Sequence, residues 1–205
     1  MLPRLIRAQF EQACGLVETL SQASPGADPF FVAVSVPAGQ LSDRAVVDDV
    51  VEILDRTGID PSLLMVELND LTSLSGRYGI KTAVTALRAE GVRITLGQFG
   101  GRASSMRDLR ELPFTDVTID SSFIDAIDES SEDLAMVTGL VSLAQALGMT
   151  CAADGVADAD QASALLRLGC DLGRGGFWGA AAPESELQAV LRKLSRPLAV
   201  LRKIV

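Results

Sequence analysis

Short apolar runs alternate with longer segments of helical periodicity along most of this chain. Residues 30–36 are almost continuously apolar, interrupted only by Ser35, which is typical of a strand buried on both faces. In residues 92–96 the apolar side chains alternate with Arg93 and Thr95, as in a half-buried strand. The same pattern along the chain predicts six strands, at residues 30–36, 64–68, 92–96, 116–120, 150–153 and 175–178.

Helical patterns separate these runs. The strongest covers residues 132–147 and ends at Gly148. Its apolar stripe consists of Leu134, Val137, Leu140, Val141, Ala144 and Leu147. Ser42 and Asp158 are the expected N-caps of two other helices, because their side chains can accept backbone hydrogen bonds. The predicted helices cover residues 3–22, 43–57, 80–90, 104–111, 132–147, 158–168 and 184–194.

Alternation of strands and helices predicts an α/β fold with a parallel sheet and right-handed crossovers. An open, doubly wound sheet and a curved barrel both fit this order, and both place functional groups at the carboxyl ends of the strands. The chain has 205 residues, which suits a single domain. A closed eight-stranded barrel takes about 250 residues, so the length is short for one.

Composition excludes several classes of function. The net charge is −9, which argues against general nucleic-acid binding because that requires a basic face. The chain contains no histidine, which removes histidine-dependent nucleophilic triads and histidine-ligated zinc. Cys14, Cys151 and Cys170 are widely spaced, so we expect buried thiols rather than disulfides or a zinc site. We also predict no membrane span and no signal peptide, and therefore a cytoplasmic protein.

Polar groups at the ends of the predicted strands form an ordered set. Their order and spacing resemble the EAL family, the modified barrel domains that hydrolyse cyclic di-GMP. The most specific segments are Phe99-Gly100 with Ser104-Ser105, Ile119-Asp120 with Phe123, Asp154-Gly155-Val156 with Gln161, and Leu168-Gly169-Cys170-Asp171. The resemblance covers nearly the whole chain and implies an incomplete or modified TIM-like (β/α) barrel of about six parallel strands with surrounding helices. The first two strands and the Glu-Ala-Leu signature would lie upstream, so residues 1–205 would be one N-terminally shortened domain.

The resemblance also implies where the family's metal-dependent chemistry would lie. Ser35 aligns with the family's metal-binding Asn, Gly97 and Gln98 with its Asp-Asp pair, and Thr118 with its Lys. Asp154 and Ala157 align with the two acidic residues of the Glu-Gly-Val motif, and Arg174 aligns with a Gln. Glu67 and Asp120 alone are unchanged. The vestigial site positions are therefore Ser35, Glu67, Gly97, Gln98, Thr118, Asp120, Asp154, Ala157 and Arg174.

We predict from these losses that the chain has no catalytic residues, no cofactor and no Mg²⁺ or Mn²⁺ site, because divalent metals need clustered carboxylates. The leading hypothesis is an inactive regulatory or scaffolding module of bacterial signalling, with a protein partner or a second copy covering the open edge of the barrel. A non-hydrolysing cyclic di-GMP receptor is the alternative, although the missing signature segment disfavours binding. An active phosphodiesterase completed by an upstream segment is the least favoured hypothesis.

Several residues have simpler structural interpretations. Asp120 is expected to order its own loop by accepting backbone hydrogen bonds, and Trp178 to pack partly buried in the core. Gly100, Gly101, Gly173, Gly175 and Gly176 are expected in tight turns rather than around a phosphate. Residues 187–205 are expected to form a basic, amphipathic C-terminal segment, which either stabilises the last helix, packs on another chain or continues into a missing one.

Overall fold

The computed structural model describes residues 2–23, 30–71, 77–101, 106–180, 183, 186 and 202–203. These residues form two compact units. The first contains residues 2–97 and 106–115, and the second contains residues 98–101 and 116–203, within the ranges described. The chain passes from one unit to the other inside strand β3 (Arg93–Phe99), between Gly97 and Gln98.

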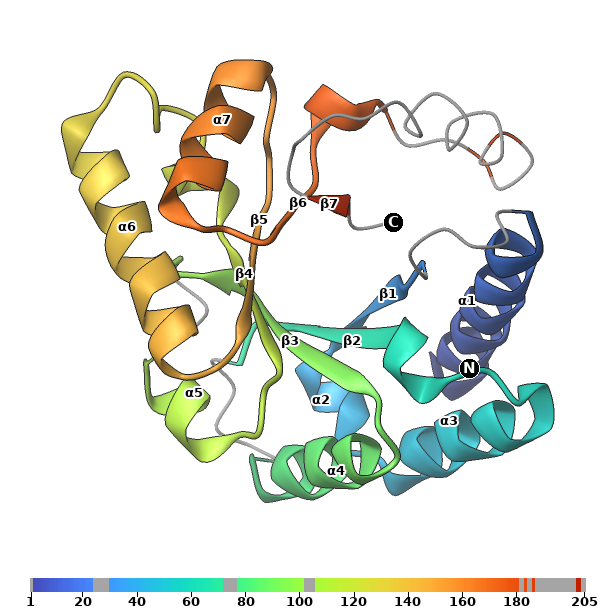
Figure 1. The fold of residues 1–205 in the computed structure, drawn as a ribbon. Coiled ribbons are helices and arrows are strands. Elements are labelled where there is room, and N and C mark those ends of the chain that lie inside the picture. Colours follow the sequence, from blue (N-terminus) through green and yellow to red (C-terminus); the bar gives the residue numbers. More distant parts are fainter. Residues whose placement is uncertain are drawn as a thin grey trace. The chain divides into compact units, whose positions relative to one another are not determined.

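The first unit pairs three parallel strands with helices (Figure 1). Strand β1 (Val32–Pro37) pairs with β2 (Leu64–Asn69), which pairs with β3. The helices are α1 (Leu2–Ala23), α2 (Ala38–Leu41), α3 (Arg44–Thr57), α4 (Arg77–Ala89) and α5 (Met106–Glu111), with a 3₁₀ turn, η1, at Pro61–Leu63. Because β2 is buried at every position from Leu64 to Leu68, its apolar side chains supply the centre of this core.

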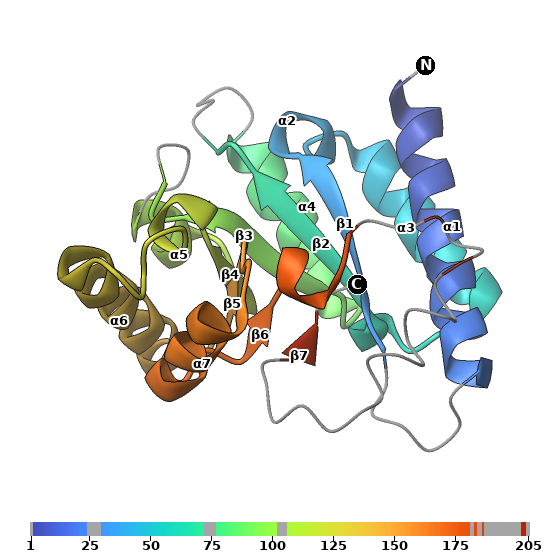
Figure 2. The same cartoon turned by 90° about the horizontal axis from the view of Figure 1, so that it is seen from above.

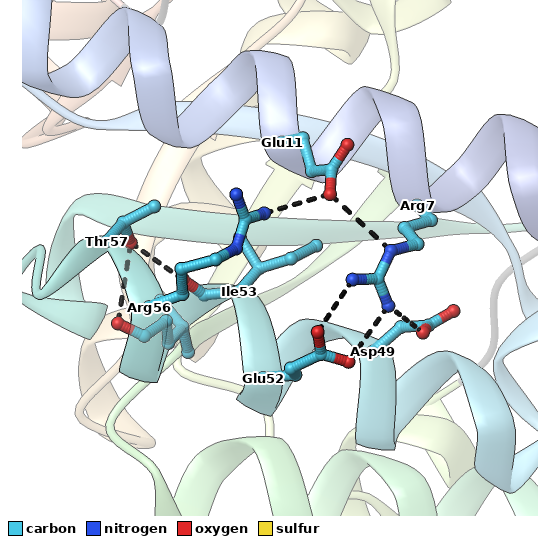
Figure 3. Close-up of polar contacts among 8 residues, drawn as sticks. Arg7, Glu11, Asp49, Glu52, Ile53, Arg56 and Thr57 are labelled. Atoms are coloured by element: carbon cyan, nitrogen blue, oxygen red, sulfur yellow. Dashed lines mark hydrogen bonds and ion pairs between the residues drawn. The ribbon is translucent and has the colours of Figure 1, made fainter.

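Helix α1 packs against both α3 and β1, and the two helices lie on the same side of the strand (Figure 2). An ion-pair network joins the helices across their exposed edge (Figure 3). Arg7 of α1 binds Asp49 and also Glu52, the latter with Nη2 2.9 Å from Oε1. Glu11 of α1 lies 2.9 Å from Arg56 Nη2 and 3.4 Å from Arg7 Nε. The network therefore fixes the register of two helices that the apolar core already holds together.

The second unit has parallel strand pairs of its own. Strand β4 (Asp116–Ile119) pairs with β5 (Thr150–Ala153), β5 with β6 (Leu172–Gly173), and β6 with β7 (Arg202–Lys203). Helices α6 (Ser131–Ala146) and α7 (Ala159–Leu168) connect these strands, and α6 packs on β4 and β5. Two 3₁₀ turns, η2 (Ser121–Phe123) and η3 (Gly176–Trp178), follow β4 and β6.

The structure confirms the alternation of parallel strands and helices and most of the predicted boundaries. Asp158 is the N-cap of α7, as predicted, and its carboxylate accepts from the backbone N–H groups of Asp160 and Gln161 at 2.9 Å. Cys14, Cys151 and Cys170 are buried free thiols. Trp178 is 8% exposed and stands edge-on to Phe177, in agreement with its expected place in the core.

Four local predictions are wrong. The sixth strand is Leu172–Gly173, whereas residues 176–178 form the turn η3, because three nearby glycines favour a turn over a strand. The N-cap of α3 is Asp43 instead of Ser42, which follows the short, unpredicted helix α2. Strand β1 alternates between buried and exposed positions, although its sequence is nearly all apolar.

The fourth error concerns the apolar stripe of α6. Its central members Val137, Leu140, Val141 and Ala144 are buried, but Leu134 and Leu147 at its ends are 39% and 50% exposed. The helix is longer than the strands β4 and β5 that it covers, so its end residues reach beyond them. Apart from residue 186, the predicted helix at 184–194 lies outside the described residues, as does most of the C-terminal segment 187–205. No helix in the described part of the chain has the length and apolar composition of a membrane span.

Candidate functional site

The first unit brings together three of the predicted site residues on neighbouring strands. Ser35 of β1 pairs in register with Glu67 of β2, and Glu67 pairs with Thr95 of β3. Since side chains two residues apart point to the same face of a strand, Asn69 and Gly97 lie on this face as well. Glu67 is only 3% exposed, so a carboxyl group is buried at the carboxyl end of the sheet.

The amide of Asn69 links two of these strands. Its Nδ2 donates a hydrogen bond to Oγ of Ser35 at 2.8 Å. Gly97 lies beside the same amide, so closely that a Cβ added to Gly97 would be 1.8 Å from Asn69 Oδ1 and 2.8 Å from Glu67 Oε1. The sequence interpretation placed Asn69 at a strand end but did not include it among the site positions. The available signal was its place two residues after Glu67 on the same strand, and therefore on the same face.

In the second unit, Asp154 and Arg174 form an ion pair. The guanidinium donates from Nε to Oδ1 at 2.9 Å and from Nη2 to Oδ2 at 2.8 Å. The backbone holds both residues in place, because Arg174 N donates to Ala153 O and Val156 N donates to Arg174 O. The carboxylate is therefore engaged by a bidentate arginine, which is the strongest common geometry for such a pair.

Asp120 orders the loop that follows β4, as expected from the sequence. Its Oδ1 accepts from the backbone N–H of Ser122 at 2.9 Å and caps the turn η2. Its other oxygen would lie 2.7 Å from a Cβ on Gly101, so only glycine fits closely there. Gln98 aligns with the second aspartate of the family's Asp-Asp pair in the resemblance. Its backbone is left-handed, with φ of 51°. For a residue other than glycine this conformation costs about 1 kcal/mol or more.

Thr118 and Ala157, the last two predicted positions, carry no charge. Thr118 is 2% exposed in β4, and its neutral hydroxyl stands where the resemblance would place a lysine. Ala157 is exposed, and its N–H donates to Oε1 of Gln161 at 2.8 Å. This bond and the Asp158 cap together satisfy donors at the start of α7. Both positions are thus explained by local structure.

Mg²⁺ or Mn²⁺, which the resemblance implies, does not fit the residues present in either unit. In the first unit, among the described strand positions Ser35, Glu67, Asn69, Thr95 and Gly97 on this face, Glu67 alone carries a carboxylate, and Asn69 fills the space beside Gly97. In the second, Arg174 occupies both oxygens of Asp154. No group of three or more acidic or cysteine side chains suited to a metal is found among the described residues. A divalent cation needs more oxygen ligands of negative charge than either set supplies.

Comparison with known proteins places this geometry in a family. The model of the EAL domain matches residues 1–181. MucR of Pseudomonas aeruginosa, named a bifunctional diguanylate cyclase/cyclic di-GMP phosphodiesterase, is 32% identical over 77% of this chain and 23% of its own length. RocR of the same organism, named a cyclic di-GMP phosphodiesterase, is 27% identical over 90% of this chain and 46% of its own. The chain therefore spans less than half the length of these two relatives.

Solved structures agree in fold. The PaMucR phosphodiesterase in complex with c-di-GMP superimposes with a TM-score of 0.79 and 29% identity, over 90% of this chain and 74% of its own. The EAL domain of Mycobacterium smegmatis DcpA gives a TM-score of 0.82 and 26% identity, over 91% and 83% of the two chains. These likenesses confirm the modified TIM-like barrel that the family resemblance implied.

Proposed function

We propose that this chain, which belongs to the EAL domain family, works in cyclic di-GMP signalling as a non-hydrolysing module that binds another protein. Family membership supplies the signalling context, since the relatives named above are cyclic di-GMP phosphodiesterases. The absence of hydrolysis is our inference from the residues at the strand ends. We place the module in the cytoplasm, where a cyclic dinucleotide signal is read.

The ion pair between Arg174 and Asp154 carries the proposal. Asp154 is the acidic residue of the Asp154-Gly155-Val156 motif, and a catalytic metal would have to share its carboxylate. Both of its oxygens accept hydrogen bonds from one guanidinium, at 2.8 and 2.9 Å. An arginine is charged at every accessible pH. It therefore repels a divalent cation and, at the same time, satisfies the carboxylate that the cation would need.

The residues near the end of strand β3 support the same conclusion independently. Gly97 and Gln98 stand where the family's two adjacent aspartates would be, so two negative charges are missing. Loss of a single metal ligand or of its supporting group costs about 10–100-fold in affinity or activity. Several such losses in one site leave too little charge to lower the pKa of a metal-bound water for attack on a phosphodiester.

The edge of the parallel sheet in the first unit supports the proposed partner. Among the described strands, β1 has β2 as its only neighbour. Its burial alternates, so Ser35 and Pro37 are exposed on a strand that is otherwise apolar. An edge strand of this kind presents backbone hydrogen-bonding groups to an additional chain. We propose that a protein partner, or a second copy, covers this edge.

A hydrolysis assay tests the loss of catalysis. The purified protein with Mn²⁺ or Mg²⁺ is expected to convert cyclic di-GMP no faster than its Glu67→Gln variant, which removes the buried carboxylate. Hydrolysis that depends on the metal and falls in the variant would contradict the proposal.

Partner binding is tested separately by light scattering and by capture from the source cells, with Ser35→Arg on β1 as the interface variant. A strictly monomeric particle that captures no protein would count against a binding role.

A cyclic di-GMP receptor is the second candidate. The observation in its favour is the 29% identical PaMucR phosphodiesterase structure, which is a c-di-GMP complex. Isothermal titration with cyclic di-GMP in the presence of EDTA separates the two candidates. Micromolar or tighter binding would support the receptor hypothesis. The absence of any heat of binding would favour the protein-binding module.

A further inference from the structure

Asn69 and Gly97 occupy one small volume on neighbouring strands. A Cβ on Gly97 would lie 1.8 Å from Asn69 Oδ1 and 2.9 Å from its Cγ. Real Cβ atoms essentially never approach another heavy atom below 3.0 Å. Asn69 cannot turn away at no cost, because its Nδ2 donates to Ser35 Oγ at 2.8 Å. The asparagine in this conformation and any side chain at position 97 therefore exclude each other.

The amide oxygen is also closed to an incoming ion. Asn69 Oδ1 has essentially no solvent-accessible surface and accepts no hydrogen bond from the described residues. Exchanging the two ends of the amide would put an N–H group at this point, with Oδ1 then facing Ser35, and the heavy atoms would not move. In both orientations an uncharged polar group stands against Gly97 and near Oε1 of Glu67. The steric relationship does not depend on the choice.

We propose that Asn69 is the group that closes the cation site of the first unit, and that Asn69 and Gly97 form a matched pair. The asparagine takes the volume that a side chain at position 97 would need, and it contributes no negative charge beside Glu67. A carboxylate restored at position 97 alone would collide with it. This inference rests on the proposed loss of metal binding and identifies the residue, outside the aligned family positions, that makes the loss structural.

A double-mutant cycle on thermal stability tests the pairing without reference to activity. Gly97→Ala is expected to lower the Tm by about 5–10 °C, as a steric conflict of about 2–3 kcal/mol does in a chain of this size. In the Asn69→Ala background the same change is expected to cost less than half as much, because the two approaches to Asn69 are removed and only the 2.8 Å approach to Glu67 Oε1 remains. Equal costs in both backgrounds overturn the proposal.

Gly15→Ala serves as the matched control. Gly15 lies in α1 of the same unit, and an added Cβ there meets nothing within 4 Å. The substitution is expected to leave the Tm unchanged or to raise it, because alanine favours a helix over glycine. A loss of Tm as large as that of Gly97→Ala would show that the assay reports a general intolerance of glycine replacement, and would overturn the specific steric assignment.

Manganese titration then separates the proposal from the proposed function. The wild-type Tm is expected not to change with Mn²⁺, and Gly97→Asp is expected to gain no Mn²⁺-dependent rise, whereas Gly97→Asp with Asn69→Ala gains one. A Tm of the wild type that rises with Mn²⁺ would contradict the proposed loss of metal binding. The double-mutant cycle would still test the pairing of Asn69 with Gly97, because it does not depend on a metal. If the double variant shows no rise although the cycle reveals coupling, Asn69 is not the excluding group and the proposal fails.

Discussion

Arg174 and Asp154, which follow neighbouring parallel strands, form an ion pair through two hydrogen bonds, with N···O distances of 2.9 and 2.8 Å. Both residues follow strands whose pairing is in register, Ala152 with Leu172 and Ala153 with Gly173. The strand register brings the guanidinium to the carboxylate without help from a flexible loop. About a third of each side chain remains exposed, so solvent screens the pair and its contribution to the free energy of unfolding is small.

Replacing the arginine by the residue that the family resemblance assigns to this position tests that pair. Arg174→Gln is expected to lower the free energy of unfolding by about 0.5–1.5 kcal/mol, because two charge-assisted hydrogen bonds are lost. Urea denaturation of the wild type, Arg174→Gln, Asp154→Asn and the double variant measures the coupling. Strictly additive single effects would mean that the two side chains do not stabilise each other.

Gly175 is expected to tolerate no side chain. Its φ is 151°, and an added Cβ would lie 2.2 Å from Val156 O, a backbone atom that cannot rotate away. Gly175→Ala should therefore lower stability by about 2 kcal/mol or more, which corresponds to a Tm loss of about 4–8 °C. The adjacent Gly176 provides the control, because a Cβ there meets nothing within 4 Å. Thermal unfolding that gave equal losses for Gly175→Ala and Gly176→Ala would contradict this account.

The network between α1 and α3 predicts a pH dependence (Figure 3). Hydrogen bonds and charge attraction from Arg7 lower the pKa of Glu52 below the ordinary glutamate value. A carboxyl whose pKa is lowered by folding stabilises the native state above that ordinary value, and this contribution is lost as the pH falls through the lowered pKa. Arg7→Gln is thus expected to destabilise the protein at pH 7 and to matter progressively less on acidification towards pH 3.

Urea denaturation of the wild type and Arg7→Gln at both pH values measures this difference. Arg44→Gln is the control, because Arg44 and Asp48 are highly exposed and 3.8 Å apart. The control should change stability little at either pH. An effect of Arg7→Gln that stayed constant from pH 7 to pH 3 would show that Arg7 acts through packing rather than through its carboxylate partners.

The three thiols are expected to be unreactive in the native protein. Cys14, Cys151 and Cys170 are buried, and the thiolate is the form that reacts. The hydrogen bond with Cys170 and then burial raise the pKa of Cys151, and burial raises that of Cys14. An aromatic disulfide reagent should therefore modify no thiol at pH 8 until the chain unfolds, and all three in denaturant. A thiol that reacts at once without denaturant would show that its part of the core opens readily.

Features that depend on neighbours along the chain were predictable from the sequence. Asp158 caps α7 because its carboxylate reaches N–H groups two and three residues ahead. The strand ends at Glu67 and Asp120 were identified because an apolar run, its stop and its turn residues all lie within a few positions of one another. The sixth strand was placed wrongly because it has only two residues, which is too short for an alternating pattern to be detected.

The contents of the site depended on contacts that periodicity does not record. The sequence by itself determined the alternation of parallel strands and helices and the positions of the strand ends, because both are properties of residue type and local spacing. Only the tertiary structure decided that Asn69 stands against Gly97 and that Arg174 binds Asp154. Those contacts follow from the register between strands and from side-chain rotamers, which are set by residues far apart in the chain.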